Sequence, residues 1–92
     1  MNKISVKKVN EDKSKFTFNI EVREGASKTE HVVTMTKRFY VSLETEKSPE
    51  TVIKKSFEFL LERESKDSIL AEFDITVISK YFPEYETKLK DF

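Results

Sequence analysis

The side chains best suited to chemistry in this chain are one histidine and a series of carboxylates. His31 is the only histidine, and the chain has no cysteine. A zinc or copper site needs several imidazole or thiolate ligands, and a catalytic triad would have to use this one ring. His31 shares a strand face with Val33 and Met35, which indicates a histidine at a strand end that is partly exposed or satisfied by one hydrogen bond.

Acidic residues are frequent in the second half, but their spacing matches neither an ion-binding loop nor a paired acid–base site. Asp67 and Asp74 precede apolar helical runs and suit helix N-caps, and Glu84 suits a first helical turn. The single glycine excludes a glycine-rich phosphate loop. We therefore predict no catalytic residue, no metal site, no cofactor and no enzymatic activity.

Basic residues offer a second kind of chemistry, the binding of nucleic acid. The candidate contacts combine cations with an aromatic ring that could stack on a base, and they are Lys15, Arg23, Lys37, Arg38 and Tyr40. The net charge of the chain is zero, with nine basic against six acidic residues in 1–45 (+3) and eight against eleven in 46–92 (−3). A balanced chain lacks the global field that attracts DNA or an anionic membrane, so nucleic-acid binding is the alternative prediction.

Three segments of the N-terminal half have the pattern of strands. In 15–23 the apolar residues Phe16, Phe18, Ile20 and Val22 alternate with polar ones, as on a strand with one buried face. Residues 3–9 are similar until Val9 breaks the alternation, and 30–36 places His31 with two apolar residues on one face. Gly25 suits the bend between the second and third segments. These segments predict a three-stranded antiparallel meander.

Residues 37–44 fit either a strand or a helix. Phe39, Val41 and Leu43 alternate, whereas Phe39, Tyr40 and Leu43 form a helical stripe. A strand running on from 30 would reach about 14 residues, well beyond the usual 5–6. We therefore place a break near Thr36, which could cap a short helix.

Helices are predicted for most of the remaining chain. Ser48 is an N-cap candidate, and Pro49 and Glu50 suit the first turn of a helix with a wide apolar face. A short helix capped by Ser65 or Asp67 would present Ile69, Leu70 and Phe73, and another would start at Asp74 and end at Phe82, before Pro83. Pro83 could itself begin a last helix carrying Tyr85 and Leu89.

Residues 56–86 carry three runs that support this interpretation, "SFEFLLERE", "SILAEFDITVI" and "VISKYFPEYE". In these runs the chain resembles a group of short prokaryotic proteins with SFxFLLxRE, SILxxFD and VIxxYFPEY sequences, for which no activity is known. The resemblance implies a shared fold and no reaction. In that group the segment corresponding to 37–43 is helical and acidic, which favours the break near Thr36.

The expected fold is an α+β domain spanning 1–92, in which the N-terminal meander is followed by three to four helices packed on one sheet face. Such a length is typical of one domain. A cytoplasmic location is expected, because the N-terminus lacks an apolar signal segment and a short secreted domain would often contain disulfides.

The chain has more large apolar side chains than the main helical stripes need for the core. The surplus consists of Val52, Phe59, Val77, Tyr81, Tyr85 and Phe92. Exposed together, they would mark a contact with another protein or with a second copy of the chain. We therefore expect a small non-enzymatic interaction or accessory module, with a homodimer as one form of that contact.

Overall fold

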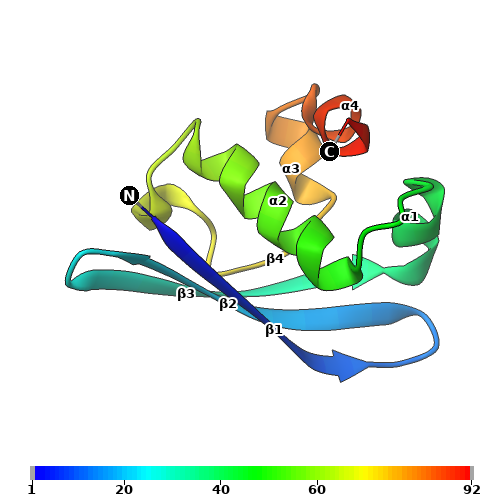
Figure 1. Ribbon diagram of the computed structural model, residues 1–92, viewed down its shortest axis with the longest axis horizontal. Coiled ribbons are helices and arrows are strands. Elements are labelled where there is room, and N and C mark those ends of the chain that lie inside the picture. The colour runs from blue at the N-terminus through cyan, green and yellow to red at the C-terminus, as the bar shows by residue number, and fades with distance from the viewer. Residues whose placement is uncertain (1, 92) are drawn as a thin grey trace.

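The computed structural model describes residues 2–91, in which four helices cover one face of a four-stranded sheet (Figure 1). The strands lie in the order β1 (Lys3–Glu11), β2 (Lys15–Glu24), β3 (Ser27–Thr36) and β4 (Glu72–Asp74). The first three pair antiparallel, which confirms the predicted meander. The fourth strand pairs parallel to β3 and was not predicted.

Alternation along β2 and β3 produces the buried face of this sheet. Phe16, Phe18, Ile20 and Val22 point inward from β2, and Val33 and Met35 point inward from β3. The pairing of β1 with β2 shifts register between Lys8 and Asn10, where Val9 breaks the sequence pattern. Gly25, at φ +60, makes the turn between β2 and β3, as expected for a residue without a Cβ.

The two predicted helix starts in the middle of the chain are confirmed. The Thr36 hydroxyl accepts a hydrogen bond from the Phe39 N–H and caps α1 (Lys37–Ser42), so 37–42 is helical. The Ser48 hydroxyl accepts from the Thr51 N–H and caps α2 (Pro49–Leu61), with Pro49 in the first turn. Helix α2 lies across the apolar face of the sheet (Figure 1).

The prediction of a helix presenting Ile69, Leu70 and Phe73 is wrong. A short 3₁₀ helix, η1 (Lys66–Ser68), leads into β4 instead. The Val32 N–H donates to the Ala71 carbonyl and the Ile75 N–H donates to the Thr34 carbonyl, both at 2.8 Å. Pairing with β3 places Phe73 over Phe57, with ring centroids 6.1 Å apart, and this tertiary contact overrides the helical spacing of the local sequence.

The last two helices are shorter than predicted. Helix α3 (Val77–Tyr81) has Phe82 as its C-cap, consistent with the predicted end at Phe82 before Pro83, but its N-cap is Thr76 rather than Asp74. The Asp74 carboxylate ends β4, because it accepts hydrogen bonds from the Thr76 N–H and hydroxyl and from the Thr34 hydroxyl. Helix α4 (Tyr85–Lys90) starts two residues after Pro83 and buries Tyr85 and Leu89.

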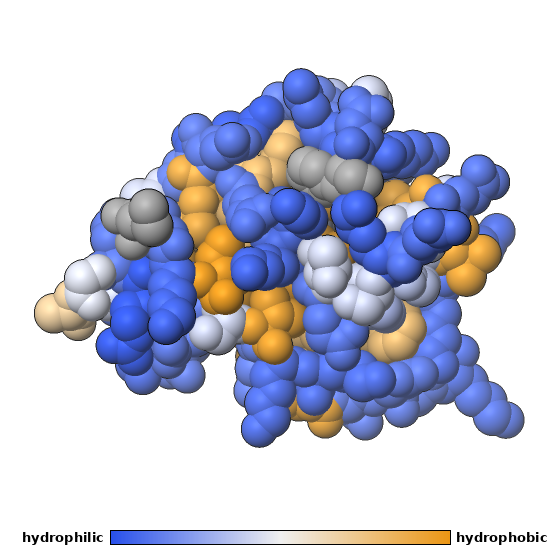
Figure 2. Space-filling model, in the orientation of Figure 1, coloured by the Kyte–Doolittle hydropathy of each residue, from blue (hydrophilic) through white to orange (hydrophobic). Residues whose placement is uncertain are grey.

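Hydrophilic residues dominate the part of the surface that Figure 2 displays, with hydrophobic residues visible in the gaps between them. Among residues 2–91, no helix has the length and apolar character needed to span a bilayer.

Candidate functional site

Three of the side chains predicted to face a partner are buried, so the prediction of their exposure is wrong. Val52, Phe59 and Tyr85 are 2%, 3% and 0% exposed. Helix α4 packs on α2 and places the Tyr85 ring 5.3 Å from the Phe59 ring. The wide apolar face of α2 therefore has two contacts, one with the sheet and one with α4. Phe92, a further member of the predicted set, lies outside the described residues.

Burial of Tyr85 places its hydroxyl in a small polar pair inside the core. The hydroxyl lies 2.6 Å from the Ser56 hydroxyl, which donates a hydrogen bond of 2.8 Å to the Val52 carbonyl. Burial raises the pKa of Tyr85 well above its ordinary value, against the smaller lowering effect of the Ser56 hydrogen bond. These groups stabilise the packing of α4 on α2 and are closed to a partner.

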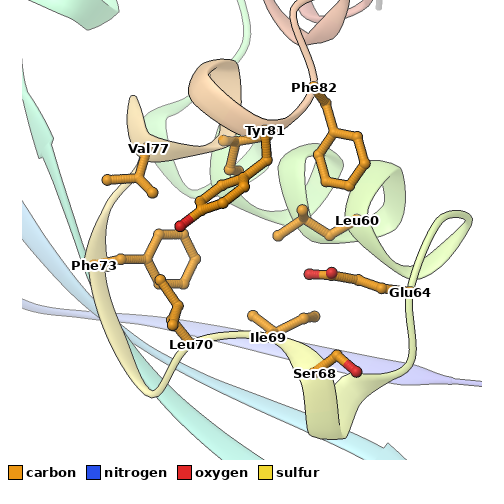
Figure 3. Close-up of a pocket in the computed structure, with 10 residues that line it drawn as sticks. Leu60, Glu64, Ser68, Ile69, Leu70, Phe73, Val77, Tyr81 and Phe82 are labelled. Atoms are coloured by element: carbon orange, nitrogen blue, oxygen red, sulfur yellow. The ribbon is translucent and has the colours of Figure 1, made fainter.

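The other two members of the predicted surface, Val77 and Tyr81, line an apolar pocket of about 460 Å³. We call it the Tyr81 pocket. Its walls come from the C-terminal part of α2, the segment around η1, β4 and α3, and consist of Leu60, Glu64, Ser68, Ile69, Leu70, Phe73, Val77, Ile78, Tyr81 and Phe82. Figure 3 shows these side chains arranged around an open centre.

Two large apolar side chains of this lining are exposed. Leu70 is 51% and Tyr81 69% exposed, whereas Ile69, Ile78 and Leu60 below them belong to the buried core. The pocket is therefore continuous with the core at its base and open to solvent at its rim.

Glu64 contributes the one charged group of the lining. Its carboxylate points toward the centre of the pocket (Figure 3), and within residues 2–91 no hydrogen bond or ion pair engages it. The hydroxyls of Ser68 and Tyr81 also belong to the lining. An apolar hollow with a single free carboxylate fits an apolar group that carries a cation.

Buried polar contacts from β3 hold the base of the pocket in place. The His31 Nδ1 donates to the Leu70 carbonyl at 2.7 Å, and its Nε2 lies 2.9 Å from the Thr29 hydroxyl, which donates to it when the ring is neutral. His31 is 3% exposed and packs on Phe57, so the expectation of a partly exposed ring or a single bond is wrong. Residues 69–71 lie beside β3 in the folded chain, so the Leu70 carbonyl becomes a second hydrogen-bond partner of the His31 ring.

Lys66 fixes the other end of the same segment. Its side chain is 4% exposed, and its Nζ donates to the Ser27 hydroxyl at 2.7 Å and lies 3.3 Å from the Asp67 carboxylate. Together with His31 and Asp74, it connects residues 66–76 to β3 at three points. The pocket is consequently formed before any partner arrives.

The arrangement of the carboxylates bears on whether a metal ion could bind. In the described part of the chain, no three His, Asp or Glu side chains are placed to hold a metal ion. Both ring nitrogens of His31 are engaged, by the Thr29 hydroxyl and the Leu70 carbonyl, and the ring packs on Phe57. The Tyr81 pocket can thus bind and orient a group, and the residues that line it form no nucleophile–base pair.

The residues of the alternative prediction fall into two places. Lys15, Lys37, Arg38 and Tyr40 lie where β2 begins and β3 ends, whereas Arg23 lies at the other end of β2. Lys37 is 3.0 Å from the Glu11 carboxylate. The Tyr40 ring packs edge-on against Phe16 and its hydroxyl donates to the Lys47 carbonyl, so this ring is not free to stack on a base.

Sequence reasoning missed Glu64, Leu70 and Phe73 as members of one site. The sequence analysis places Leu70 and Phe73 on a short helix and gives Glu64 no role. The available signal was the turn-forming segment "SKDS" (65–68), which separates Glu64 from Leu70 in the chain, although both line the same pocket.

Comparisons of the chain with models of protein families, with curated proteins and with solved structures found no match. A functional proposal for this chain therefore rests on its own geometry.

Proposed function

We propose that this protein is a small non-enzymatic interaction module that binds a partner protein at the Tyr81 pocket. The observation that carries the proposal is the exposure of Leu70 and Tyr81, at 51% and 69%, beside a preformed apolar hollow. Single exposed apolar residues are ordinary on protein surfaces, but adjacent ones around a pocket are typical of contact sites. Val77 and Tyr81 of the predicted surface are retained in this proposal.

The size, walls and charge of the pocket predict which side chains the partner presents. Its volume of about 460 Å³ lies within the roughly 300–1,000 Å³ typical of ligand pockets. Apolar walls favour a large aliphatic or aromatic side chain, and the free Glu64 carboxylate favours a nearby lysine or arginine. A protein segment with an apolar anchor and a basic neighbour satisfies both, and we place this interaction in the cytoplasm.

Photo-cross-linking in cells that contain the native protein tests the proposal. A photoreactive phenylalanine analogue at position 70 should give discrete cross-linked species, because this position lies at the pocket rim. The matched control is position 41, since Val41 is also apolar and is 70% exposed but belongs to α1, outside the pocket. Tyr81→Ser should remove the species formed at position 70 without changing the fold.

The mass of the cross-linked species distinguishes two forms of the proposal. A mass of two chains, together with concentration-dependent sedimentation, would identify the partner as a second copy and the module as a homodimer. A larger or smaller mass identifies another protein. Equal cross-linking at positions 41 and 70, or none at position 70, contradicts the proposal.

Nucleic-acid binding stays the alternative prediction. Lys15, Lys37 and Arg38 lie at one end of the sheet, but Arg23 does not join them. Binding of mixed oligonucleotides at low salt, weakening steeply as salt is added, would favour this alternative over the protein partner.

A further inference from the structure

The outer edge of β4 is an open hydrogen-bonding edge. The Ala71 carbonyl and the Ile75 N–H point toward β3 and are hydrogen-bonded to it, and Phe73 pairs with Val33 in the same ladder. Since hydrogen-bonding groups alternate sides along a strand, the N–H and carbonyl groups of Glu72 and Asp74 point away from β3. Within residues 2–91, no hydrogen bond engages these backbone groups.

This open edge runs directly beside the Tyr81 pocket. Leu70 precedes β4, Phe73 lies within it and Val77 follows it, and all three line the pocket. Phe73 points to the helix-covered face, where it packs on Phe57. Neighbouring strands place side chains of the same face next to each other, so a strand added at β4 would set an inward side chain beside Phe73, in the pocket.

The negative charge near this edge favours a basic incoming segment. Glu64 is the charged member of the pocket lining, and Glu72 lies exposed on β4. Two cations of the neighbouring segment, Lys66 and Arg63, are engaged elsewhere, since Lys66 is bonded to Ser27 and the Arg63 guanidinium lies 3.6 Å from the Phe59 ring centroid. A lysine or arginine of an incoming segment would find a free carboxylate.

We infer that β4 and the Tyr81 pocket together receive an extended segment of a partner protein by strand addition, with one apolar side chain in the pocket and a lysine or arginine at Glu64. This inference rests on the proposed function and specifies it. Backbone hydrogen bonds to Glu72 and Asp74 supply the alignment, and the pocket supplies the side-chain preference.

Selection from a phage-displayed library of random peptides of about twelve residues, on the immobilised full chain, tests the inference. Enriched peptides should alternate apolar and polar residues and carry a lysine or arginine near the apolar anchor. The affinity of synthetic copies of the enriched peptides for the full chain is then measured by titration calorimetry. N-methylation of the peptide backbone should weaken binding at least about tenfold at alternate positions and little at the positions between them, because only every second N–H faces β4.

Two protein variants with matched controls locate the contact. Glu64→Gln keeps the shape of the lining and should weaken binding about five- to tenfold for basic peptides, but not for copies in which the basic residue is replaced by glutamine. Glu72→Pro removes the outward N–H without touching the bonds of Ala71 or Ile75, and should weaken binding about tenfold relative to Glu72→Thr. Unchanged spectra of both variants in circular dichroism show that the fold is kept.

The outcomes separate this inference from the proposed function. Enriched peptides with apolar residues three and four apart, insensitive to alternate N-methylation, would overturn strand addition while supporting a partner in the pocket. No enrichment over an unrelated immobilised protein also overturns it, and a cross-link at position 70 would then still uphold the proposed function. Binding that Glu72→Pro leaves unchanged contradicts the role of the β4 edge.

Discussion

Substitution of Tyr85 by phenylalanine tests whether α4 seals the core as the structure shows. Tyr85 is 0% exposed, and its hydroxyl lies 2.6 Å from the Ser56 hydroxyl. Tyr85→Phe keeps the ring packing against Phe59 and removes the hydroxyl. Because Ser56 retains its bond to the Val52 carbonyl, the free energy of unfolding at pH 7 should fall by about 1 kcal/mol.

The alkaline pH dependence of the same variant is a sharper test. Burial, with smaller contributions from Glu86 and Asp74, raises the pKa of Tyr85 in the folded chain well above its ordinary value of 10.0. Above about pH 10 the unfolded chain therefore loses a proton that the folded chain keeps, so rising pH favours unfolding. The contribution is fully present below pH 10 and should decline by up to about 1.4 kcal/mol for each further pH unit, until the folded pKa is reached.

Urea unfolding followed by far-ultraviolet circular dichroism between pH 8 and 11 measures this difference. Every other ionisable group is the same in the two proteins, so subtracting the Tyr85→Phe values from the wild-type values isolates Tyr85. At pH 11 the wild type should have lost about 1.4 kcal/mol of stability through Tyr85 relative to pH 8, so it should no longer be more stable than Tyr85→Phe. Tyr81→Phe is the matched control, since Tyr81 is 69% exposed and its variant should follow the wild type throughout.

Parallel stability curves for wild type and Tyr85→Phe from pH 8 to 11 would refute this reasoning, because they would mean that the Tyr85 hydroxyl ionises in the folded chain. The same result in Tyr81→Phe as in Tyr85→Phe would show that the effect does not depend on burial.

Three further predictions concern the other parts of the fold. Leu70→Ser and Tyr81→Ser should each change the free energy of unfolding by no more than about 0.5 kcal/mol, whereas Phe57→Ala in the core should lower it by about 3–5 kcal/mol. Urea titrations measure all three variants. A large loss of stability in Leu70→Ser or Tyr81→Ser would mean that the residue belongs to the core. Thr36→Ala should cost about 1 kcal/mol through loss of the α1 cap, and Thr36→Asn should restore most of it in the same titrations. Asp74→Ala should cost about 1–3 kcal/mol and speed hydrogen exchange at the Ile75 amide, measured by nuclear magnetic resonance, while an unchanged exchange rate would contradict its role in holding β4.

A strand or helix could be predicted from the sequence where its local pattern and its tertiary contacts favour the same structure. The strict alternation of 15–23 places Phe18 and Ile20 on one face whatever lies above them, because strand side chains alternate. Thr36 and Ser48 satisfy the free N–H groups of their own helices, so these helix starts need no distant partner. The meander, the break at Thr36 and helix α2 were predictable for this reason.

The rest was decided by contacts between segments far apart in the chain. Residues 69–73 have a helical spacing of apolar side chains, yet they form no helix and lead into β4 (Glu72–Asp74), because the free edge of β3 and the ring of Phe57 lie beside them. Phe59 and Tyr85 look surplus along the sequence, but each buries the other once α4 folds onto α2. The Tyr81 pocket joins Glu64, Leu70 and Tyr81 from three different segments.

Backbone periodicity and helix capping act over a few residues, so the order of residues along the chain is enough to specify which side chains are apolar on each face of a strand or long helix. Which of those apolar faces stay exposed depends on how much surface the other segments cover, and this follows from the packing of segments that are distant in the chain. Leu70 and Tyr81 remain open at the rim of the pocket, whereas Phe59 and Tyr85 are closed between α2 and α4.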